Sequence, residues 1–535
     1  GNPNYNEYQD DIYVGYRYFT TFKKEQNKVL YPFGFGLSYT SFKWELVKSN
    51  DNLNIQIKVT NIGKYPGKEV LEIYVKKPSI KYHNPTFQLI NFVKTKLLDV
   101  GEEEIININI DNYYLSTFDE STNNFVIEKG IYEFYLGDSI NNVNLFNYNQ
   151  KAEYVYKECL DSIKLTSDIS VLNQDNKLSL KLKDSYYNTN LKSRIINNLP
   201  KPIKQNNNKY TFIDLLNSKC TKEEFVGCLS LKELSDLSHG IGCMSTKLGF
   251  SGNAGAFGGI TQALRKKRLI KPIITSDGPS GLSLGNYTTM LPSAWSIAAT
   301  FNDNLTEQCY RGIAEEMEYY HIDVLLGPGL NIHRNILCGR NFEYYSEDPY
   351  LSGMMASASV KGIESKGKAS CIKHFACNNQ EKNRRFTDVR ISNQALREIY
   401  LRPFEICVRS AHPKCIMTSY NKINGIYSYY NYDLINTILR KDWNYDGIVL
   451  TDWYIQKANS NIFKKIKNNS YRIRSGNDIL MPGNLSLTKR RYKYEREIVK
   501  NLSLKPNDFE NLTLGELQMV AVHVIELLIK LNNIK

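Results

Sequence analysis

The sequence lacks the patterns that assign a chain to a disulfide-rich, metal-binding or membrane class. Its ten cysteines include no CxxC pair and no Cys/His cluster with the spacing of a zinc site, which predicts neither a disulfide scaffold nor a bound metal. No apolar run approaches the roughly 18 residues that a membrane-spanning helix needs. The first residues, GNPNYNEYQDD, resemble no signal peptide. We therefore expect a soluble chain with no membrane partner, and its cellular location stays open.

Concentrated charge is also scarce, although the formal net charge is +13. The lysines and arginines are spread along the chain, and the only dense runs are RKKR (265–268) and TKRRYKYER (488–496). Binding to a nucleic-acid backbone needs clustered cations, so we expect a solvated basic surface and no nucleic-acid partner.

Length and composition indicate several packed domains. The chain has 535 residues, of which 42% are hydrophobic and 12% aromatic. A single core does not grow to this size, and at about 150 residues per domain the chain holds about three or four units.

The first part of the chain reads as a β-sandwich behind a short leading segment. Residues 1–37 are rich in Tyr, Gly and Phe but have too few apolar positions to form a domain alone, so they must pack on something else. Within 38–150, apolar and polar residues alternate, which buries one face of each strand. The alternating runs predict an antiparallel sandwich of the fibronectin type III or immunoglobulin kind, and they are 53–61, 69–75, 104–110 and 130–137.

The second part reads as a linker followed by an α/β domain. Residues 151–215 are polar and rich in Asn and Lys, which predicts a linker that wraps a neighbouring domain. From 216 to 535, short apolar strands alternate with helical stretches, which is typical of parallel βαβ units and favours a (β/α)8 barrel with a C-terminal helix. The expected strands are 271–277, 322–330, 369–375, 414–420, 447–452 and 477–483.

Polar residues stand at the carboxyl ends of several of these predicted strands. In a parallel barrel the carboxyl ends of the strands meet at one face, where the active site forms, so these side chains should converge. They are Asp277, Lys373, His374, Tyr420 and Asp452. Each also has a plainer explanation: a turn-forming Asp277, a salt-bridged Lys373, a core His374 or a packed Tyr420. Arg340 could likewise do no more than pair with Glu343 or Glu347.

The motifs around these residues resemble glycoside hydrolase family 3. These long motifs, in this order, resemble the barrel of that family over most of 240–485. They are ITSDGPSGL (274–282), GPGLNIHRNILCGRNFEYYSEDPYLSG (327–353), IKHFACNNQEKNRRFTDVRISNQALREIYLRPFE (372–405), IMTSYNKING (416–425) and GIVLTDW (447–453). Residues 13–42 resemble the end of the family's α/β sandwich domain, and 38–150 its fibronectin type III-like domain. The resemblance, to which SGNAGAFGGITQAL (251–264) adds, implies a permuted multidomain protein whose TIM-like barrel comes last.

The resemblance implies a retaining, exo-acting β-glycosidase, with β-glucosidase as the leading activity. Asp452 would be the nucleophile that forms a covalent glycosyl-Asp intermediate, and the sugar would be bound by Asp277, Arg340, Lys373, His374, Tyr420 and Trp453. A retaining enzyme needs an ionised carboxylate and a proton donor about 5–5.5 Å apart, and no cofactor or metal. The expected partner is an oligosaccharide or glycoside, and homo-oligomerisation stays open.

Two departures from the family pattern bear on catalysis. The family's acid/base glutamate lies in the α/β sandwich domain, upstream of the part matched by 13–42, so we expect an N-terminally incomplete fragment; the alternatives are another proton donor or a degraded relative. Ser283 lies near the place where relatives carry an arginine. Glu381 is a poor substitute acid, because the nearby arginines at 384 and 385, three and four positions away, favour its ionised form.

Other functions stay open beside β-glucosidase. A β-xylosidase differs by pocket shape that the sequence does not reveal, and a catalytically impaired sugar-binding homologue would keep the same pocket. An adhesion or scaffold protein built on the β-sandwich would leave the polar strand-end residues unexplained.

Overall fold

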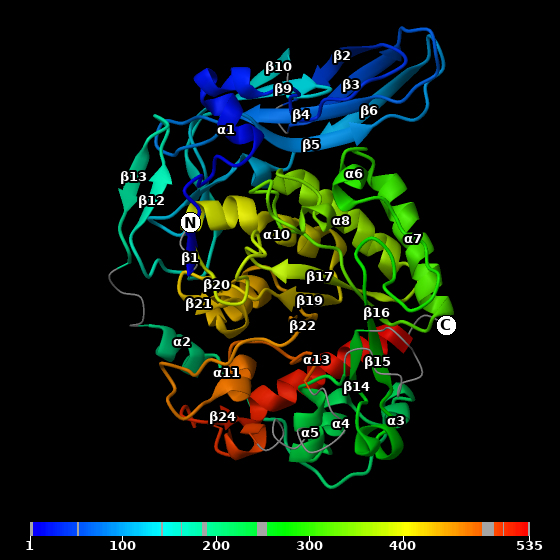
Figure 1. Cartoon of the computed structure of the whole chain (residues 1–535), viewed down its shortest axis with the longest axis vertical. Helices are drawn as coiled ribbons and strands as arrows, with labels where there is room; N and C mark the ends of the chain where they lie inside the picture. The colour runs from blue at the N-terminus through cyan, green and yellow to red at the C-terminus, as the bar shows by residue number, and fades with distance from the viewer. Residues whose placement is uncertain are drawn as a thin grey trace.

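The structure of the protein is a computed structural model that describes residues 4–50, 53–140, 143–161, 163–184, 190–242, 254–483, 497–506 and 508–532. The basic run 488–496 and the start of the 251–264 motif lie outside the described residues. Figure 1 shows a β-sandwich at one end, a central sheet with its helices in the middle, and the C-terminal helices at the other end.

The β-sandwich is confirmed and consists of two antiparallel sheets. One sheet has the order β2-β3-β6 and the other β10-β9-β4-β5. Alternate residues of β3 are buried, as the alternating sequence predicts, and they pack into a separate aliphatic core with residues of β4, β6 and β9. The strands are β2 (Phe42–Ser49), β3 (Asn54–Asn61), β4 (Val70–Lys76), β5 (Gln88–Lys94), β6 (Glu103–Asn109), β9 (Gly130–Gly137) and β10 (Val143–Gln150).

The stretch expected to be a linker carries short elements of its own. Strand β11 pairs with β8 in the three-stranded sheet β11-β8-β7, and β12 and β13 form a hairpin. Ile169 and Val171 of that hairpin are buried in a small cluster with Leu165. The elements of this stretch are β11 (Tyr154–Glu158), β12 (Ile169–Leu172), β13 (Leu178–Lys181), α2 (Leu191–Asn197) and the start of α3 (Phe212–Leu216), while β7 (Thr117–Asp119) and β8 (Asn124–Ile127) precede it.

The central sheet has six strands in the order β14-β15-β16-β17-β19-β22. Within this sheet, β15, β16, β17, β19 and β22 pair in parallel. Strand β17 is buried along its whole length, as expected where both faces of a parallel sheet are covered. These strands are β14 (Gly255–Gly258), β15 (Pro272–Asp277), β16 (Val324–Leu326), β17 (Ala369–Phe375), β19 (Cys415–Thr418) and β22 (Ile448–Thr451). Five of the six strands predicted from the sequence are thus present.

The sheet departs from a regular parallel barrel in two ways. Strand β14 runs antiparallel to β15, and the connection between them, residues 259–271, contains the short π-helix η4 (Ala263–Lys267). The predicted strand at 477–483 takes part only through single bridges, Leu450 to Ile479 and Leu480 to His239. A further bridge joins Ile241 to Ala256 of β14, so the pairing leads from the last strand back to the first.

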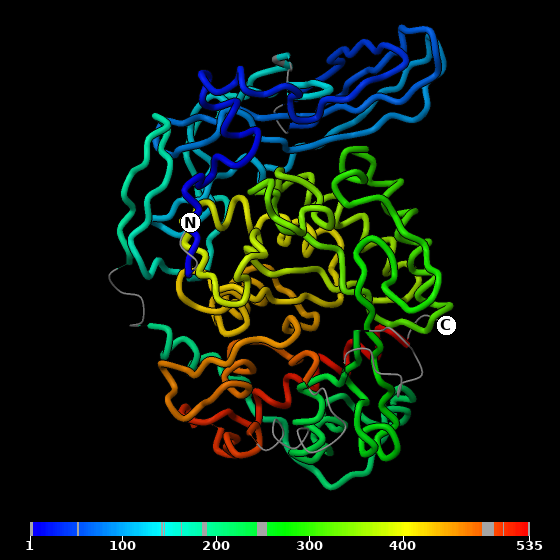
Figure 2. The backbone as a smooth tube through the Cα atoms, viewed as in Figure 1, coloured from blue at the N-terminus to red at the C-terminus, as the bar shows by residue number. Residues whose placement is uncertain are grey.

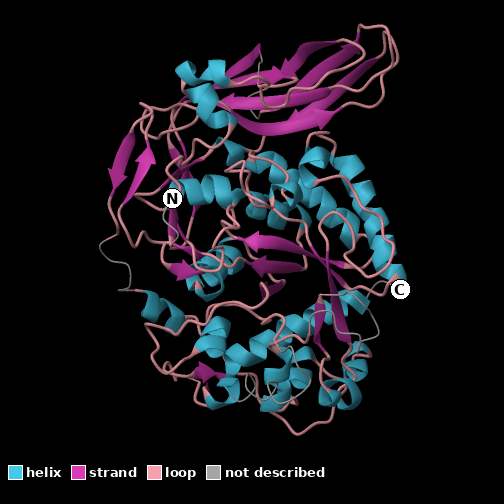
Figure 3. Ribbon diagram, viewed as in Figure 1, coloured by secondary structure: helices cyan, strands magenta, loops and turns pink. Residues whose placement is uncertain are grey.

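Helices cover the central sheet and separate it from the β-sandwich (Figure 3). Asp348 caps the buried helix α8 and Pro349 begins it, which are favourable residues for those positions. Among the described residues, no helix combines the length and apolarity needed to cross a bilayer. The longer helices are α7 (Asp303–Tyr319), α8 (Pro349–Glu364), α10 (Arg402–Ala411), the π-helix η8 (Asp433–Asp442) and α13 (Leu514–Asn532), and the shorter ones include α4 (Lys222–Gly227), α5 (Leu231–Leu237), α6 (Ala294–Ala298), η5 (Asn341–Glu343) and α11 (Asn468–Arg474).

The leading segment packs along the α/β domain, as Figure 2 shows for the start of the chain. Strand β1 (Tyr5–Glu7) pairs in parallel with β18 (Asp388–Arg390), which continues to β20 (Lys422–Ile423) and β21 (Ile426–Tyr427). Helix α1 (Tyr16–Thr21) is fixed by a buried carboxylate: Asp348 accepts hydrogen bonds from the Tyr16 hydroxyl at 2.8 Å and from Arg17 at 2.7 Å. The segment that cannot form a core alone therefore shares the core of the α/β domain.

We predict that Asp348→Ala destabilises the protein strongly. The change leaves the buried Arg17 guanidinium without its carboxylate and removes the cap of α8, and breaking a buried ion pair costs about 3–5 kcal/mol. Thermal unfolding followed by circular dichroism measures the effect. Glu307→Ala, which breaks an exposed pair with Arg311, is the matched control and should change stability by at most about 0.5 kcal/mol. Equal midpoints for the two variants would refute the bracing role of Asp348.

Candidate active site

Asp452 lies immediately after β22 and is almost fully buried. Its Oδ1 accepts a hydrogen bond from the Trp453 backbone N–H at 2.6 Å, and its Oδ2 has no hydrogen-bond partner among the described residues. The Nε2 atom of His374 lies 3.8 Å from this Oδ2. A buried carboxylate oxygen without a partner is costly, which marks this atom as one that a ligand or reacting group can use.

A β-bulge brings two consecutive side chains of β17 to the site. Ile372 pairs with Ile416 and Phe375 with Thr418, so β17 has one residue more than β19 between these pairs. In a regular strand, neighbouring side chains point to opposite faces, and a bulge re-aims one of them. Lys373 and His374, which occupy the bulge, contact Asp277 and Asp452 respectively.

Asp277 is placed by a glycine turn at the end of β15. Gly278 has φ of +119°, and a Cβ added there would lie 1.7 Å from the Gly281 carbonyl oxygen, so no other residue fits. The turn closes with a hydrogen bond from Ser283 N–H to the Asp277 carbonyl at 2.8 Å. The Asp277 side chain is 60% exposed, and its Oδ1 accepts from Lys373 Nζ at 2.8 Å. The cluster therefore reaches solvent at Asp277.

Glu343 joins Arg340 to Lys373. It pairs with the Arg340 guanidinium, and its other carboxylate oxygen lies 3.8 Å from Lys373 Nζ. From the sequence, Glu343 is expected only as a structural partner of Arg340. That pairing is present, and the same carboxylate also orders the second cation of the site.

Tyr420 and Trp453 join the cluster next to Asp452. The Tyr420 hydroxyl donates to the Trp453 carbonyl oxygen at 2.5 Å, and the Trp453 indole N–H donates to the Ala254 carbonyl at 3.1 Å. The Arg384 guanidinium lies over the Tyr420 ring, 4.8 Å from its centroid. All seven residues predicted from the sequence thus belong to one connected cluster.

The charges of the cluster oppose the cost of burying Asp452. Burial raises the pKa of Asp452 above its ordinary value, while Arg340, the Trp453 N–H and Lys373 each lower it. Burial lowers the pKa of Lys373, but Asp277 and Glu343 raise it more, so the ammonium stays charged. Lys373 also lowers the pKa of Asp277.

His374 is neutral, because burial and the charges of Arg340, Lys373 and Arg384 hold its pKa well below the ordinary value. The site thus presents two buried acids, Glu343 and Asp452, with two cations and one neutral imidazole, which is a set suited to polar, uncharged ligands with many hydroxyl groups. In the described part of the chain, no group of three or more His, Cys, Asp or Glu residues is arranged to hold a metal ion.

Sequence reasoning missed three residues that support this cluster: Asn331, Tyr344 and Asn378. Tyr344 reaches His374 because Gly329 bridges both Tyr344 and Lys373, and a Cβ at Gly329 would lie 2.8 Å from the Tyr344 ring. Asn331 directly follows the predicted strand 322–330, while Tyr344 and Asn378 lie within the long motifs 327–353 and 372–405, where position alone does not indicate a supporting role.

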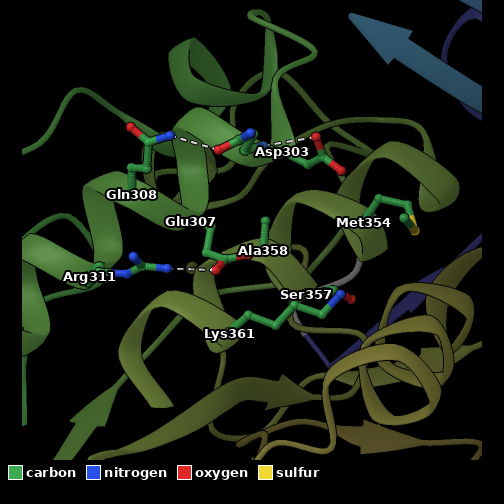
Figure 4. A pocket seen from close by; sticks show the side chains of 9 residues that line it. Asp303, Glu307, Gln308, Arg311, Met354, Ser357, Ala358 and Lys361 are labelled. Carbon is green, nitrogen blue, oxygen red and sulfur yellow. Dashed lines mark hydrogen bonds and ion pairs between the residues drawn. The ribbon is translucent and has the colours of Figure 1, made fainter. Parts of the chain in front are cut away.

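Two hollows lie away from the cluster. One of about 530 Å³ lies between α7 and α8, where Arg311 and Glu307 form an ion pair at 3.1 Å (Figure 4). Another of about 860 Å³ lies between the leading segment and α6, with Phe19, Tyr31 and Trp295 in its wall. None of the seven predicted residues lines either hollow.

Comparison with known proteins agrees with this architecture. Residues 252–513 match the glycosyl hydrolase family 3 N-terminal domain, and residues 69–140 match a fibronectin type III-like domain. The chain belongs to glycoside hydrolase family 3.

Its relatives within the family include β-glucosidases. The chain is 38% identical over 500 residues to a β-glucosidase of Ruminococcus albus, with 90% of this chain and 51% of the relative covered. It superposes on the crystal structure of a β-glucosidase from Paenibacillus barengoltzii with a TM-score of 0.89 and 35% identity, over 99% of this chain and 59% of the other. An exo-α-(1→6)-L-arabinopyranosidase of Bifidobacterium longum is 46% identical over 185 residues, which is 35% of this chain and 24% of that protein. The chain thus spans about half the length of this β-glucosidase of Ruminococcus albus.

We predict that Arg340→Met raises the pKa of Asp452. Removing the cation that most lowers this pKa leaves burial less opposed, and an opposite charge nearby is worth about one unit or more. If Asp452 is the nucleophile, as proposed below, it must be ionised to react, and the acidic limb of kcat/KM for an aryl glycoside with an activated leaving group should move to higher pH. Arg311→Met, which removes an exposed arginine of the α7–α8 hollow, should leave the limb in place. An unmoved limb in Arg340→Met would disprove the electrostatic role of Arg340.

Proposed function

We propose that this chain carries the nucleophile-bearing part of a retaining, exo-acting β-glucosidase, which removes terminal β-D-glucosyl residues through a covalent glycosyl-Asp452 intermediate. The observation that carries the proposal is the unpartnered Oδ2 of the buried Asp452, beside His374 and within the field of Arg340 and Lys373. Family membership and the β-glucosidase relatives support the same reaction.

In this proposal Asp452 attacks the anomeric carbon while the polar residues hold the sugar hydroxyls. Lys373, Arg340 and His374 are donors, and Asp277 is an acceptor at the exposed edge, where a terminal sugar can enter. Tyr420 and Trp453 shape the subsite. Charged hydrogen bonds to hydroxyls strengthen as oxocarbenium-like charge develops, which lowers the barrier to the glycosyl-enzyme.

The proposal interprets the central sheet and its single bridges as a modified (β/α)8 barrel. The bridges at Ile479, Leu480 and Ile241 support this interpretation, because they connect β22 to β14. In such a barrel the ends of β15, β17, β19 and β22 face the same opening, which is the arrangement the reaction requires.

The proton donor of the reaction is assigned to a residue beyond the described cluster. Glu381 is not a good candidate, because its two oxygens accept hydrogen bonds from Arg384 at 2.6 Å and Asn378 at 3.0 Å. The proposal therefore keeps the expectation that a glutamate of the family's α/β sandwich domain supplies the proton. Loss of general acid catalysis costs about 10²–10⁴ in rate, so substrates that need no protonation are the appropriate probes.

A fluorinated activated glucoside, 2,4-dinitrophenyl 2-deoxy-2-fluoro-β-D-glucoside, tests the nucleophile. The leaving group departs without a proton and the fluorine slows hydrolysis of the intermediate, so a glycosyl-enzyme should accumulate. Mass spectrometry of a peptic digest should find one fluoroglucosyl group on the peptide with Asp452, and Asp452→Asn should remain unlabelled. Labelling at another carboxylate, or none at all in a folded protein, would overturn the assignment.

The substrate is tested against two alternatives with the same Asp452 chemistry. A β-xylosidase would favour aryl β-xylosides, and the arabinopyranosidase relative makes aryl α-L-arabinopyranosides a necessary third probe. We expect the largest kcat/KM for the β-glucoside. A chain that binds glucose but forms no adduct with any probe would instead be a catalytically impaired sugar-binding homologue.

A further inference from the structure

A buried chain of hydrogen bonds connects a surface ion pair to the imidazole of the site. Arg384 holds Glu381, and Glu381 accepts a hydrogen bond from the Asn378 side-chain amide at 3.0 Å. The same Asn378 nitrogen donates to the Tyr344 hydroxyl at 3.1 Å, and that hydroxyl lies 3.1 Å from His374 Nδ1. Asn378, Tyr344 and His374 are all almost fully buried.

Donor and acceptor chemistry gives this chain a single direction. A carboxylate only accepts, so Glu381 fixes the amide of Asn378 with its nitrogen towards Glu381 and Tyr344. An amide nitrogen only donates, so the Tyr344 oxygen is the acceptor of that bond. The buried Tyr344 hydroxyl has no other acceptor for its proton among the described residues, so it donates to His374 Nδ1, and a bare Nδ1 on the neutral ring satisfies both atoms.

We propose that Tyr344 and Asn378 are positioning residues that hold His374 in the tautomer whose proton is on Nε2. This inference rests on the proposed function and names how one residue of its sugar subsite is prepared. In this tautomer Nε2–H lies on the side of Asp452 Oδ2, 3.8 Å away and beyond hydrogen-bond distance, and can donate to a sugar hydroxyl. In the other tautomer, two lone pairs would face each other across the site.

The main chain around His374 supports the same role. Asn331 donates from its side-chain nitrogen to the His374 carbonyl at 3.0 Å and accepts from the His374 N–H at 2.9 Å. Since the backbone is held on both sides and the ring is held at Nδ1, Nε2 has a fixed direction before substrate binds. Pre-organised donors stabilise a transition state because they need no reorientation during the reaction.

The tautomer is measured directly by two-bond ¹H–¹⁵N correlation spectra of protein labelled in its seven histidines. A His374→Gln variant assigns the signals. In the wild type we expect the ¹⁵N chemical shift of a protonated nitrogen for Nε2 of His374, and that of an unprotonated nitrogen that accepts a hydrogen bond for Nδ1. In Tyr344→Phe the Nδ1 signal should move towards that of a bare nitrogen without a donor. In Asn378→Leu, which frees the Tyr344 hydroxyl to rotate, a smaller shift in the same direction is expected.

Tyr345→Phe is the matched control, because Tyr345 is an equally buried neighbour whose hydroxyl bonds to Ser359 at 2.6 Å and not to His374. It should leave both His374 signals unchanged, and thermal unfolding checks that each variant is folded. A wild-type His374 protonated on Nδ1, or an Nδ1 signal that is the same in wild type and folded Tyr344→Phe, would overturn the proposal.

Kinetics with an activated aryl β-glucoside then measure the consequence. The loss of one positioning hydrogen bond should lower kcat/KM about 10-fold in Tyr344→Phe and leave it within about twofold in Tyr345→Phe. If the spectra agree with the proposal but no glycoside is hydrolysed, the proposed function fails and the tautomer assignment stands. If the glucoside is hydrolysed but wild-type His374 is protonated on Nδ1, the proposed function stands and the tautomer assignment fails.

Discussion

The conflict between burial and charge at Asp452 is the constraint on which the rest of the site depends. A carboxylate at the end of a buried strand loses its water, and its pKa rises for that reason. Two cations oppose this effect, and each is in turn held by carboxylates: Lys373 by Asp277 and Glu343, and Arg340 by Glu343. The arrangement keeps a charged group near a position that a neutral, hydroxyl-rich ligand can reach, and leaves one carboxylate oxygen without a partner among the described residues.

The fold supplies this arrangement by bringing distant segments to one edge of a sheet. Strand ends contribute Asp277, Lys373, His374 and Asp452, while the loop after β16 adds Arg340 and Glu343. The leading segment forms hydrogen bonds with the loops that follow β16 and β17. The Tyr8 hydroxyl donates to Asn379 at 3.1 Å, and Arg334 is bonded to Asp10 at 2.7 Å, so residues 331–334 and 377–380 are fixed by a part of the chain far away in sequence. Residues with no contact to a sugar can therefore alter the site.

Much of this could be predicted from the sequence, for identifiable reasons. Continuous apolar runs predict the parallel strands, because both faces of those strands are buried. Alternation of apolar and polar residues predicts the strands of the β-sandwich, because only one face of each is buried. The seven site residues were found partly from their positions at strand ends and partly from the family motifs. The extra residue in β17 was not foreseeable, because a bulge is defined by the partner strand. The strands within 151–215 were missed since their burial depends on neighbours that the local sequence does not contain, and the antiparallel β14 was missed for the same reason.

A crystal structure of the chain soaked with a glucose-configured iminosugar tests the central claim most directly. Such a ligand carries positive charge near the anomeric position and so mimics the charge that develops in glycoside cleavage. The account predicts a carboxylate oxygen of Asp452 in contact with the charged end of the ring, and Asp277, Arg340, Lys373 and His374 on its hydroxyls. An iminosugar bound elsewhere, or an Asp452 side chain turned away from the ring, would contradict it.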